Sequence, residues 1–272
     1  MKKNILSLGM LLAIFVVLLS SCDPKDNDKP TDIDIVDDVD EFVYPIPTPF
    51  EMTQMLEKSG ASFIMDLTNS KENAESYFSE KSKALNLGVY GADLSYTSTY
   101  NQTQETRELL NCSKILTDGL EISSMFNKNL VERVEENLEN QDSLYKIVSE
   151  SYYDTFGFLN NNGKGEISVI VLAGGWIEGI YLGTQLASLN QENNAAILLG
   201  LAEQKITLNS LIPLLENYKD NKDVAEVLDM VKQFKTVFDK VEQKDDQLFM
   251  SDEVFTELFN LVTEIRKEVV AV

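Results

Sequence analysis

A stretch of 23 residues, Ile167 to Leu189, constrains the fold more than any other part of the chain. Its sequence, ISVIVLAGGWIEGIYLGTQLASL, holds the only tryptophan, four of the thirteen glycines and a single charged residue, Glu178. A helix that is apolar on every side is normally buried on every side. The stretch therefore predicts a central core helix around which other helices pack.

Small residues recur at every fourth position of this stretch: Gly175, Gly179, Gly183 and Ala187. A second such row lies earlier in the chain: Gly91, Ser95, Thr99 and Thr103. Residues four apart share one helix face. A glycine inside a helix costs roughly 0.5–1 kcal/mol relative to alanine, so close approach of another backbone is the best reason for its presence. We predict that the two rows pack against each other.

Five of the six prolines precede residue 50, so the remainder of the chain is poor in helix breakers. Apolar periodicity and turn residues predict these helices besides the central one: 48–59, 71–85, 86–118, 123–138, 142–160, 191–204, 206–219, 223–243 and 251–270. The predicted fold is all-α, a bundle of about eight to nine helices around a buried Gly-rich central helix.

Two short patterns suggest that the bundle consists of two related helical halves. Asp93-Leu-Ser-Tyr96 and Glu178-Gly-Ile-Tyr181 both place an acid three residues before a tyrosine, and Asn-Gln follows each. The offset between the two copies changes along the chain, so a gap is needed to align them. Biased helical composition is the competing explanation.

Charge and composition exclude several classes of function. The net charge is −22, which argues against nucleic acid and against direct adsorption to anionic lipid. The chain has no histidine, so the usual nucleophilic triads and most transition-metal ligand sets are unavailable. We therefore predict no cofactor and no metal site. Cys112 lies in an apolar helical pattern, which favours a core position over a reactive thiol.

The N-terminus is typical of an export signal. Lys2 and Lys3 precede an apolar run, Ile5 to Leu19, which ends in Leu19-Ser-Ser-Cys22. This resembles the bacterial lipoprotein signal, in which the cysteine receives a lipid and cleavage occurs before it. The resemblance implies a signal peptide over residues 1–21, lipidation of Cys22 and membrane attachment through that lipid. An ordinary secretory signal with a chance cysteine is the alternative.

The next segment, residues 22–47, predicts an acidic disordered tether. Nine acids and two lysines lie between Asp23 and Glu41, a composition that cannot bury enough apolar surface to fold. Acids just after the lipidated cysteine resemble the surface-export signal of Bacteroidota lipoproteins, which implies an outer-membrane location; the surface and periplasmic faces both stay open. Residues 48–272 then form the helical domain.

Asp93 and Glu178 are the strongest candidates for functional residues. Both acids lie among small and aromatic residues, and a buried acid is costly unless it is paired. Close carboxylates raise one pKa and suit acid–base work or cation binding. The structural alternative is that each acid crosslinks helices. The aromatic residues that would complete a ligand site or a polar core are Tyr90, Tyr96, Trp176 and Tyr181; core packing is the alternative for these.

Two functional hypotheses follow. In the first, a lipid-anchored cell-envelope protein carries a helical binding or structural domain for a small ligand or an envelope partner. In the second, the domain is a carboxylate-based hydrolase or cation-dependent enzyme that uses Asp93 and Glu178. The sequence favours a non-enzymatic role, since no complete set of catalytic residues is evident. The body resembles uncharacterised helical lipoproteins of Bacteroidota, and this resemblance implies no activity.

Overall fold

The computed structural model describes residues 49–126, 128–189, 194–245 and 247–272. The α-helices are α2 (Pro49–Lys58), α3 (Glu80–Thr99), α4 (Thr103–Gly119), α5 (Lys128–Glu136), α6 (Gln141–Asn161), α7 (Gly165–Leu189), α8 (Ala195–Glu216), α9 (Lys222–Phe238) and α10 (Asp252–Val269). Short 3₁₀ helices are η1 (Met65–Leu67), η2 (Lys71–Ser76) and η3 (Ser123–Phe126), and β1 (Glu242–Lys244) pairs antiparallel with β2 (Gln247–Phe249).

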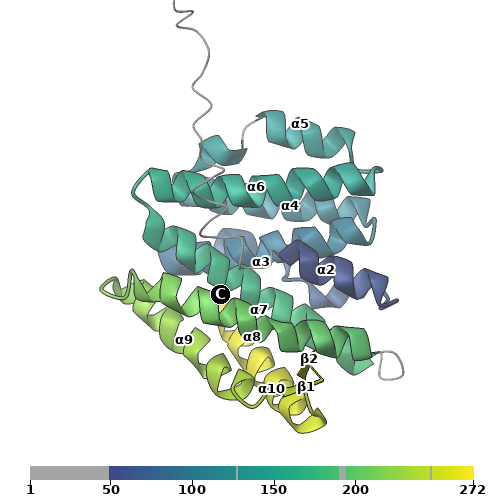
Figure 1. Ribbon diagram of the computed structural model, residues 1–272. Helices are drawn as coiled ribbons and strands as arrows, with labels where there is room; N and C mark the ends of the chain where they lie inside the picture. Colours follow the sequence, from purple (N-terminus) through teal and green to yellow (C-terminus); the bar gives the residue numbers. More distant parts are fainter. Residues whose placement is uncertain (1–48, 127, 190–193, 246) are drawn as a thin grey trace, which may run out of the picture. The chain divides into compact units, whose positions relative to one another are not determined.

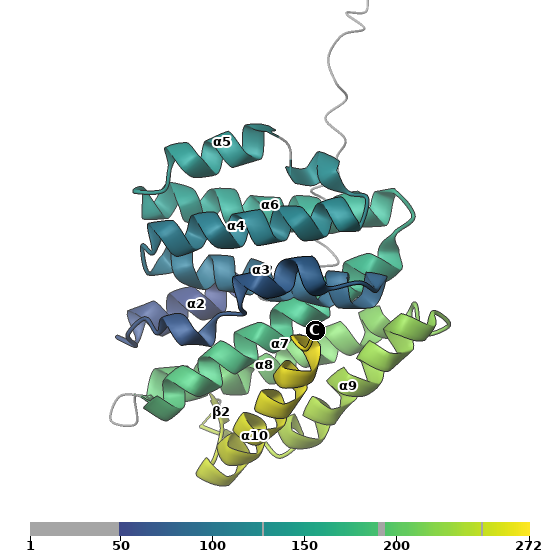
Figure 2. The same cartoon turned by 180° about the vertical axis from the view of Figure 1, so that it is seen from behind.

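The predicted all-α bundle around a buried glycine-rich helix is confirmed. Helix α7 contacts α2, α3, α6, α8, α9 and α10, and it runs through the middle of both views in Figures 1 and 2. Helices α4 to α6 lie on the α3 side of α7, whereas α8 to α10 lie on the other side. Burial on every side explains why apolar residues cover the whole surface of α7.

Helices α3 and α7 form the most extensive helix contact of the domain, and two glycines allow it. A Cβ atom at Gly88 would lie 2.1 Å from the Val171 carbonyl oxygen and 2.5 Å from the Gly175 nitrogen. A Cβ atom at Gly174 would lie 2.0 Å from the carbonyl oxygen of Leu85. The two backbones therefore touch directly, which no residue larger than glycine permits at these positions.

The predicted helix pair is correct, but the predicted faces are wrong. A Cβ atom at Gly91 would lie 3.5 Å from the Tyr152 ring of α6, and no described neighbour lies within 4 Å of a Cβ at Gly179. A Cβ at Gly183 would meet side chains of α2 and α8 rather than α3. The close contact uses Gly88 and Gly174, both of which lie outside the two predicted rows, because each row follows one helix face and carries no information on where the helices cross.

The other members of the two rows also serve neighbours outside the α3–α7 contact. The Ser95 hydroxyl lies 2.8 Å from the Thr53 hydroxyl of α2, and the Thr99 hydroxyl lies 3.3 Å from the same oxygen. Thr103 does not belong to α3, because it begins α4. Ala187 is fully buried near the C-terminal end of α7. The small residues of α3 thus accommodate α2 and α6 as well as α7.

Several predicted boundaries are wrong. The predicted helix over 86–118 is interrupted at residues 100–102, where Asn101 has a positive φ of 56°, a conformation that asparagine tolerates better than most residues. The predicted helix over 71–85 is instead η2 followed by a new α-helix, which Ser79 caps by accepting a hydrogen bond from the Ser82 amide. Helix α8 runs continuously through the predicted break near residue 205.

Among the described residues, two helices, α7 and α8, are long and apolar enough to cross a membrane by length and composition alone. In α7, 94% of the most apolar stretch is buried inside the domain, as in the core helix of a soluble bundle. The corresponding share in α8 is 39%. The predicted signal peptide, the predicted lipidation site Cys22 and the predicted acidic tether of residues 22–47 lie outside the described residues.

Candidate functional site

Asp93 and Glu178 face each other across the α3–α7 contact, and both side chains are completely buried. The glycine contact positions them. Glu178 lies one helical turn after Gly174, and Asp93 follows Gly88 by five residues on the facing helix. Direct contact of the two backbones therefore brings two carboxyl groups into the same dry interior.

Arg266 of α10 is the partner that the sequence analysis did not find. Its Nε donates to Glu178 Oε2 at 3.1 Å, and its Nη2 donates to Oε1 at 3.0 Å. The arginine side chain is 14% exposed and the glutamate is not exposed at all. This is a two-pronged guanidinium–carboxylate pair, the strongest geometry for such an interaction. Its guanidinium also lies 4.5 Å from the centre of the Tyr181 ring.

Asp93 is held by one firm hydrogen bond. Its Oδ2 accepts from the Asn69 backbone N–H at 2.8 Å, whereas no donor reaches Oδ1 within the described part of the chain. Burial raises the pKa of Asp93 well above its ordinary value; the negative charge of Glu178 adds to this effect and Arg266 opposes it. A proton on Asp93 removes one of two adjacent charges.

The polar side chains around this pair mainly fix the segment between α2 and α3, residues 61–78, which contains η1 and η2 but no α-helix. The Tyr96 hydroxyl accepts from the Ile64 backbone N–H at 2.8 Å, and the Tyr90 hydroxyl donates to the Ser70 carbonyl at 2.7 Å. Arg266 Nη2 donates to the Leu67 carbonyl at 3.1 Å. Backbone groups outside helices must find partners when they are buried, and these side chains supply them.

Asparagine side chains extend the network to the C-terminus of α10. Asn69 Nδ2 donates to the Tyr77 hydroxyl at 3.0 Å and to Asn86 Oδ1 at 3.2 Å. Asn86 Nδ2 donates in turn to the Val269 carbonyl at 2.9 Å, and the Tyr77 hydroxyl donates to the Val270 carbonyl at 3.2 Å. The free carbonyl groups at the end of α10 are satisfied in this way.

Trp176 lies apart from the two acids. Its Nε1 donates to Gln204 Oε1 of α8 at 3.1 Å, and its ring packs against Phe234 and Phe238 of α9, with centroid distances of 5.0 and 6.1 Å. Of the predicted candidates, Asp93, Glu178 and Tyr181 gather around Arg266, whereas Tyr90 and Tyr96 anchor the 61–78 segment. Trp176 belongs to the α7–α8–α9 core.

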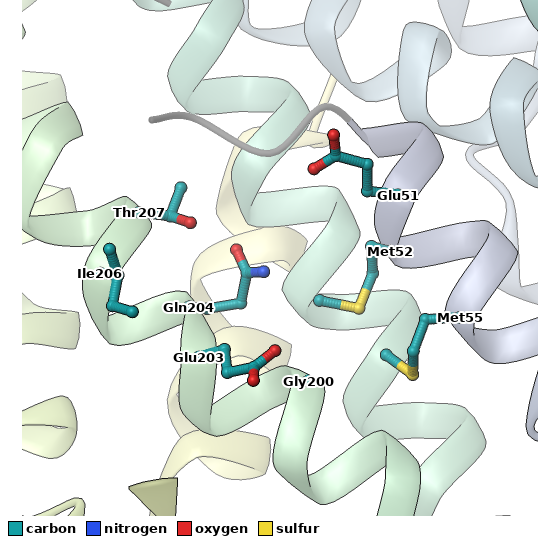
Figure 3. Close-up of a pocket in the computed structure, with 8 residues that line it drawn as sticks. All are labelled: Glu51, Met52, Met55, Gly200, Glu203, Gln204, Ile206 and Thr207. Atoms are coloured by element: carbon teal, nitrogen blue, oxygen red, sulfur yellow. The ribbon is translucent and has the colours of Figure 1, made fainter. Parts of the chain in front are cut away.

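A separate cavity of about 280 Å³ opens between α2 and α8, and Figure 3 shows the side chains that line it. The lining residues are Glu51, Met52, Met55, Gly200, Glu203, Gln204, Ile206 and Thr207. Met52, Gln204 and Thr207 are buried and form its floor, whereas Glu51, Glu203 and Ile206 are exposed at its rim. Neither Asp93 nor Glu178 lines it.

Among the described residues, no group of three or more acids or cysteines is placed to hold a metal ion. The Cys112 side chain is buried, and its Sγ lies 3.7 Å from the Lys71 carbonyl oxygen. Burial raises the pKa of the Cys112 thiol to about 11, so that thiolate is scarce at neutral pH. This position suits a core side chain.

Comparison of the chain with protein-family models, with curated proteins and with solved structures found no match. Function must therefore be argued from the geometry of this domain. Two features carry that argument: the buried cluster of Asp93, Glu178 and Arg266, and the open cavity between α2 and α8.

Proposed function

We propose that the protein is a lipid-anchored component of the cell envelope whose helical domain binds a small ligand or an envelope partner. The proposal rests on one observation: the residues that could do acid–base chemistry are not the residues that line the accessible cavity. The two acids that could do acid–base work are fully buried and bonded to the fold, whereas the accessible cavity is lined by thioether, amide and hydroxyl groups with acids at its rim. Such a lining suits binding.

The alternative, a carboxylate-based hydrolase, uses Asp93 and Glu178. The raised pKa of Asp93 beside a second carboxyl group resembles the arrangement of an acid–base pair. A hydrolase also needs room for substrate and water between its carboxyl groups. Here both side chains have no exposed surface, and Arg266 occupies both oxygens of Glu178. These contacts favour a structural role.

The anchoring part of the proposal rests on the sequence. The lipobox that ends in Cys22 supports lipidation, and the acidic segment after it supports an outer-membrane location, on the surface or the periplasmic face. The net charge of −22 supports a partner that is neither nucleic acid nor an anionic lipid surface. The lipid holds the helical domain near the membrane, where a binding role requires it.

A thermal-shift screen of the full-length protein tests the binding role. A ligand that binds only the folded state raises Tm in proportion to the logarithm of its concentration above Kd. We expect at least one class of small molecule to raise Tm in this way. The same samples are assayed for hydrolysis of chromogenic glycosides and esters, with a Glu178→Gln variant as the control. Hydrolysis that this substitution abolishes, without any ligand-dependent rise in Tm, would contradict the proposal.

A further inference from the structure

We propose that the cavity between α2 and α8 binds a small organic cation with a short alkyl body, of the alkylammonium class. This inference rests on the proposed binding function and names the ligand class for it. Three observations support it: the shape of the cavity, the charge at its rim and an unpartnered hydroxyl group in its floor.

The lining residues lie along α2 and α8, which run in opposite directions in Figure 3. At one end, a Cβ atom at Gly200 would lie 2.6 Å from Met55 Cε, so the Met55 methyl group packs directly against Gly200. At the other end, Glu51 lies one turn earlier on α2 and Thr207 lies two turns later on α8, as Figure 3 shows. Seven residues of helix span about 10 Å, which accommodates a short linear molecule in a cavity of about 280 Å³.

The apolar part of the lining suits an alkyl chain. Met52 is 5% exposed and Met55 is half-buried, and the Met55 methyl group fills the space that the absent Cβ of Gly200 leaves on α8. Methionine side chains adapt to varied apolar shapes because they are unbranched and polarisable. The chain of a bound ligand would cover Met55 and the exposed Ile206 side chain, whose apolar surfaces now face water.

The charged groups of the cavity are all negative. Glu51 and Glu203 lie at the rim, and no lysine or arginine is among the described residues of the lining. Partial burial raises the pKa of Glu51, although its side chain still reaches solvent. Partial burial removes some of the water that stabilises the Glu51 carboxylate, and a cation placed beside this carboxylate would replace that stabilisation. An anion would be repelled by both Glu51 and Glu203. The rim therefore selects for positive charge.

The floor offers a hydrogen-bonding group that the protein leaves unused. The Thr207 hydroxyl is buried, with the residue 1% exposed, and its oxygen has no partner among the described residues. Buried hydroxyl groups normally have partners. Figure 3 shows this oxygen turned toward Gln204 and the open space. An ammonium N–H of the ligand can donate to Thr207 Oγ1 at the same end of the cavity as Glu51.

The test titrates the full-length protein with hexylamine at pH 7.5, where the probe is an ammonium ion, and with hexanol and hexanoate of the same chain length. Trp176 serves as a native reporter, because it is the only tryptophan and donates to Gln204 of the floor. Calorimetry provides an independent affinity. We expect saturable binding of hexylamine, weaker binding of hexanol and no binding of hexanoate.

Two variants locate the site. Removal of one partly exposed charge in Glu51→Gln should weaken hexylamine binding roughly threefold to fivefold. Thr207→Val, which removes the unpartnered hydroxyl, should also weaken it while Tm stays the same or rises. The matched control is Glu57→Gln, which makes the same charge change on α2 outside the lining and should bind as the wild type does.

Equal binding of hexanoate and hexylamine would overturn the proposed charge selection. An equal effect of Glu57→Gln and Glu51→Gln would overturn the location. Failure of all three probes to bind, when another compound raises Tm in the screen, would overturn the ligand class and leave the binding role intact. Failure of the probes and of the whole screen would overturn both.

Discussion

The pair formed by Glu178 and Arg266 allows the most exact prediction from this structure. In the Arg266→Met variant, Glu178 remains fully buried without its cation, and the Leu67 carbonyl loses a donor. Breaking a buried ion pair by removing one partner costs about 3–5 kcal/mol, a large share of the roughly 5–15 kcal/mol that stabilises a typical domain. With a urea m-value of about 2–3 kcal/mol/M, the unfolding midpoint should fall by about 1–2.5 M.

Urea unfolding followed by Trp176 fluorescence and circular dichroism measures this change. The matched control is Arg107→Met, since Arg107 also makes a two-pronged contact with a glutamate, Glu135, but on the surface. The control should leave the midpoint close to that of the wild type. An Arg266→Met midpoint as close to wild type as the control would refute the structural role assigned to the buried pair.

Three further outcomes are expected. Gly174→Ala should strongly destabilise the protein in thermal melts, because its Cβ would meet the Leu85 carbonyl oxygen at 2.0 Å. Gly179→Ala should be neutral or stabilising by up to about 1 kcal/mol, since no described neighbour lies within 4 Å of a Cβ there. Equal melting temperatures of the two variants would contradict the packing. The raised pKa of Asp93 means that the folded state keeps a proton that the unfolded state releases. The contribution of Asp93 to stability is therefore complete below its ordinary pKa near 3.8, and it is lost as the pH rises through the raised pKa of the folded state. Asp93→Asn should therefore gain stability relative to wild type as the pH rises above 3.8 in urea titrations, and parallel pH profiles would exclude a raised pKa. Cys22→Ala should abolish incorporation of labelled fatty acid in cells, and unchanged labelling would rule out the lipobox interpretation.

The sequence predicts the centre of this fold well. The apolar residues on every side of α7 avoid water only if the whole helix is buried. Its central position can therefore be predicted without knowledge of the helices around it. The contact face could not be predicted in the same way. Gly88 and Gly174 meet because of the crossing position of two helices, which depends on every other helix in the bundle. A row of small residues indicates a close contact but not its partner.

The break between α3 and α4 gives a second example. Residues 100–102 are Tyr-Asn-Gln, without the glycine or proline that usually marks a helix end, and only the positive φ of Asn101 ends the helix. The helical pattern therefore continues through it. The start of α3 was missed for a related reason, since the Ser79 cap lacks the glutamate that completes a capping box.

The acids of the buried cluster were predictable, but their partner was not. Asp93 and Glu178 are conspicuous because apolar and small residues surround them in the sequence. Arg266 lies 88 residues after Glu178 in an amphipathic helix, where a cation is ordinary. One signal was present: Arg266 follows the buried Val262 by one turn and precedes the buried Val269, so it borders the apolar face of α10.

The most direct test of the account asks whether the domain binds at the α2–α8 cavity. Methionine methyl groups labelled with ¹³C report on it by NMR, because Met52 and Met55 line the cavity whereas Met65 and Met230 lie elsewhere. On titration with hexylamine, we expect saturable shifts of the Met52 and Met55 signals and unchanged signals for Met65 and Met230. Unchanged Met52 and Met55 signals at concentrations that saturate the calorimetric titration would contradict the central claim.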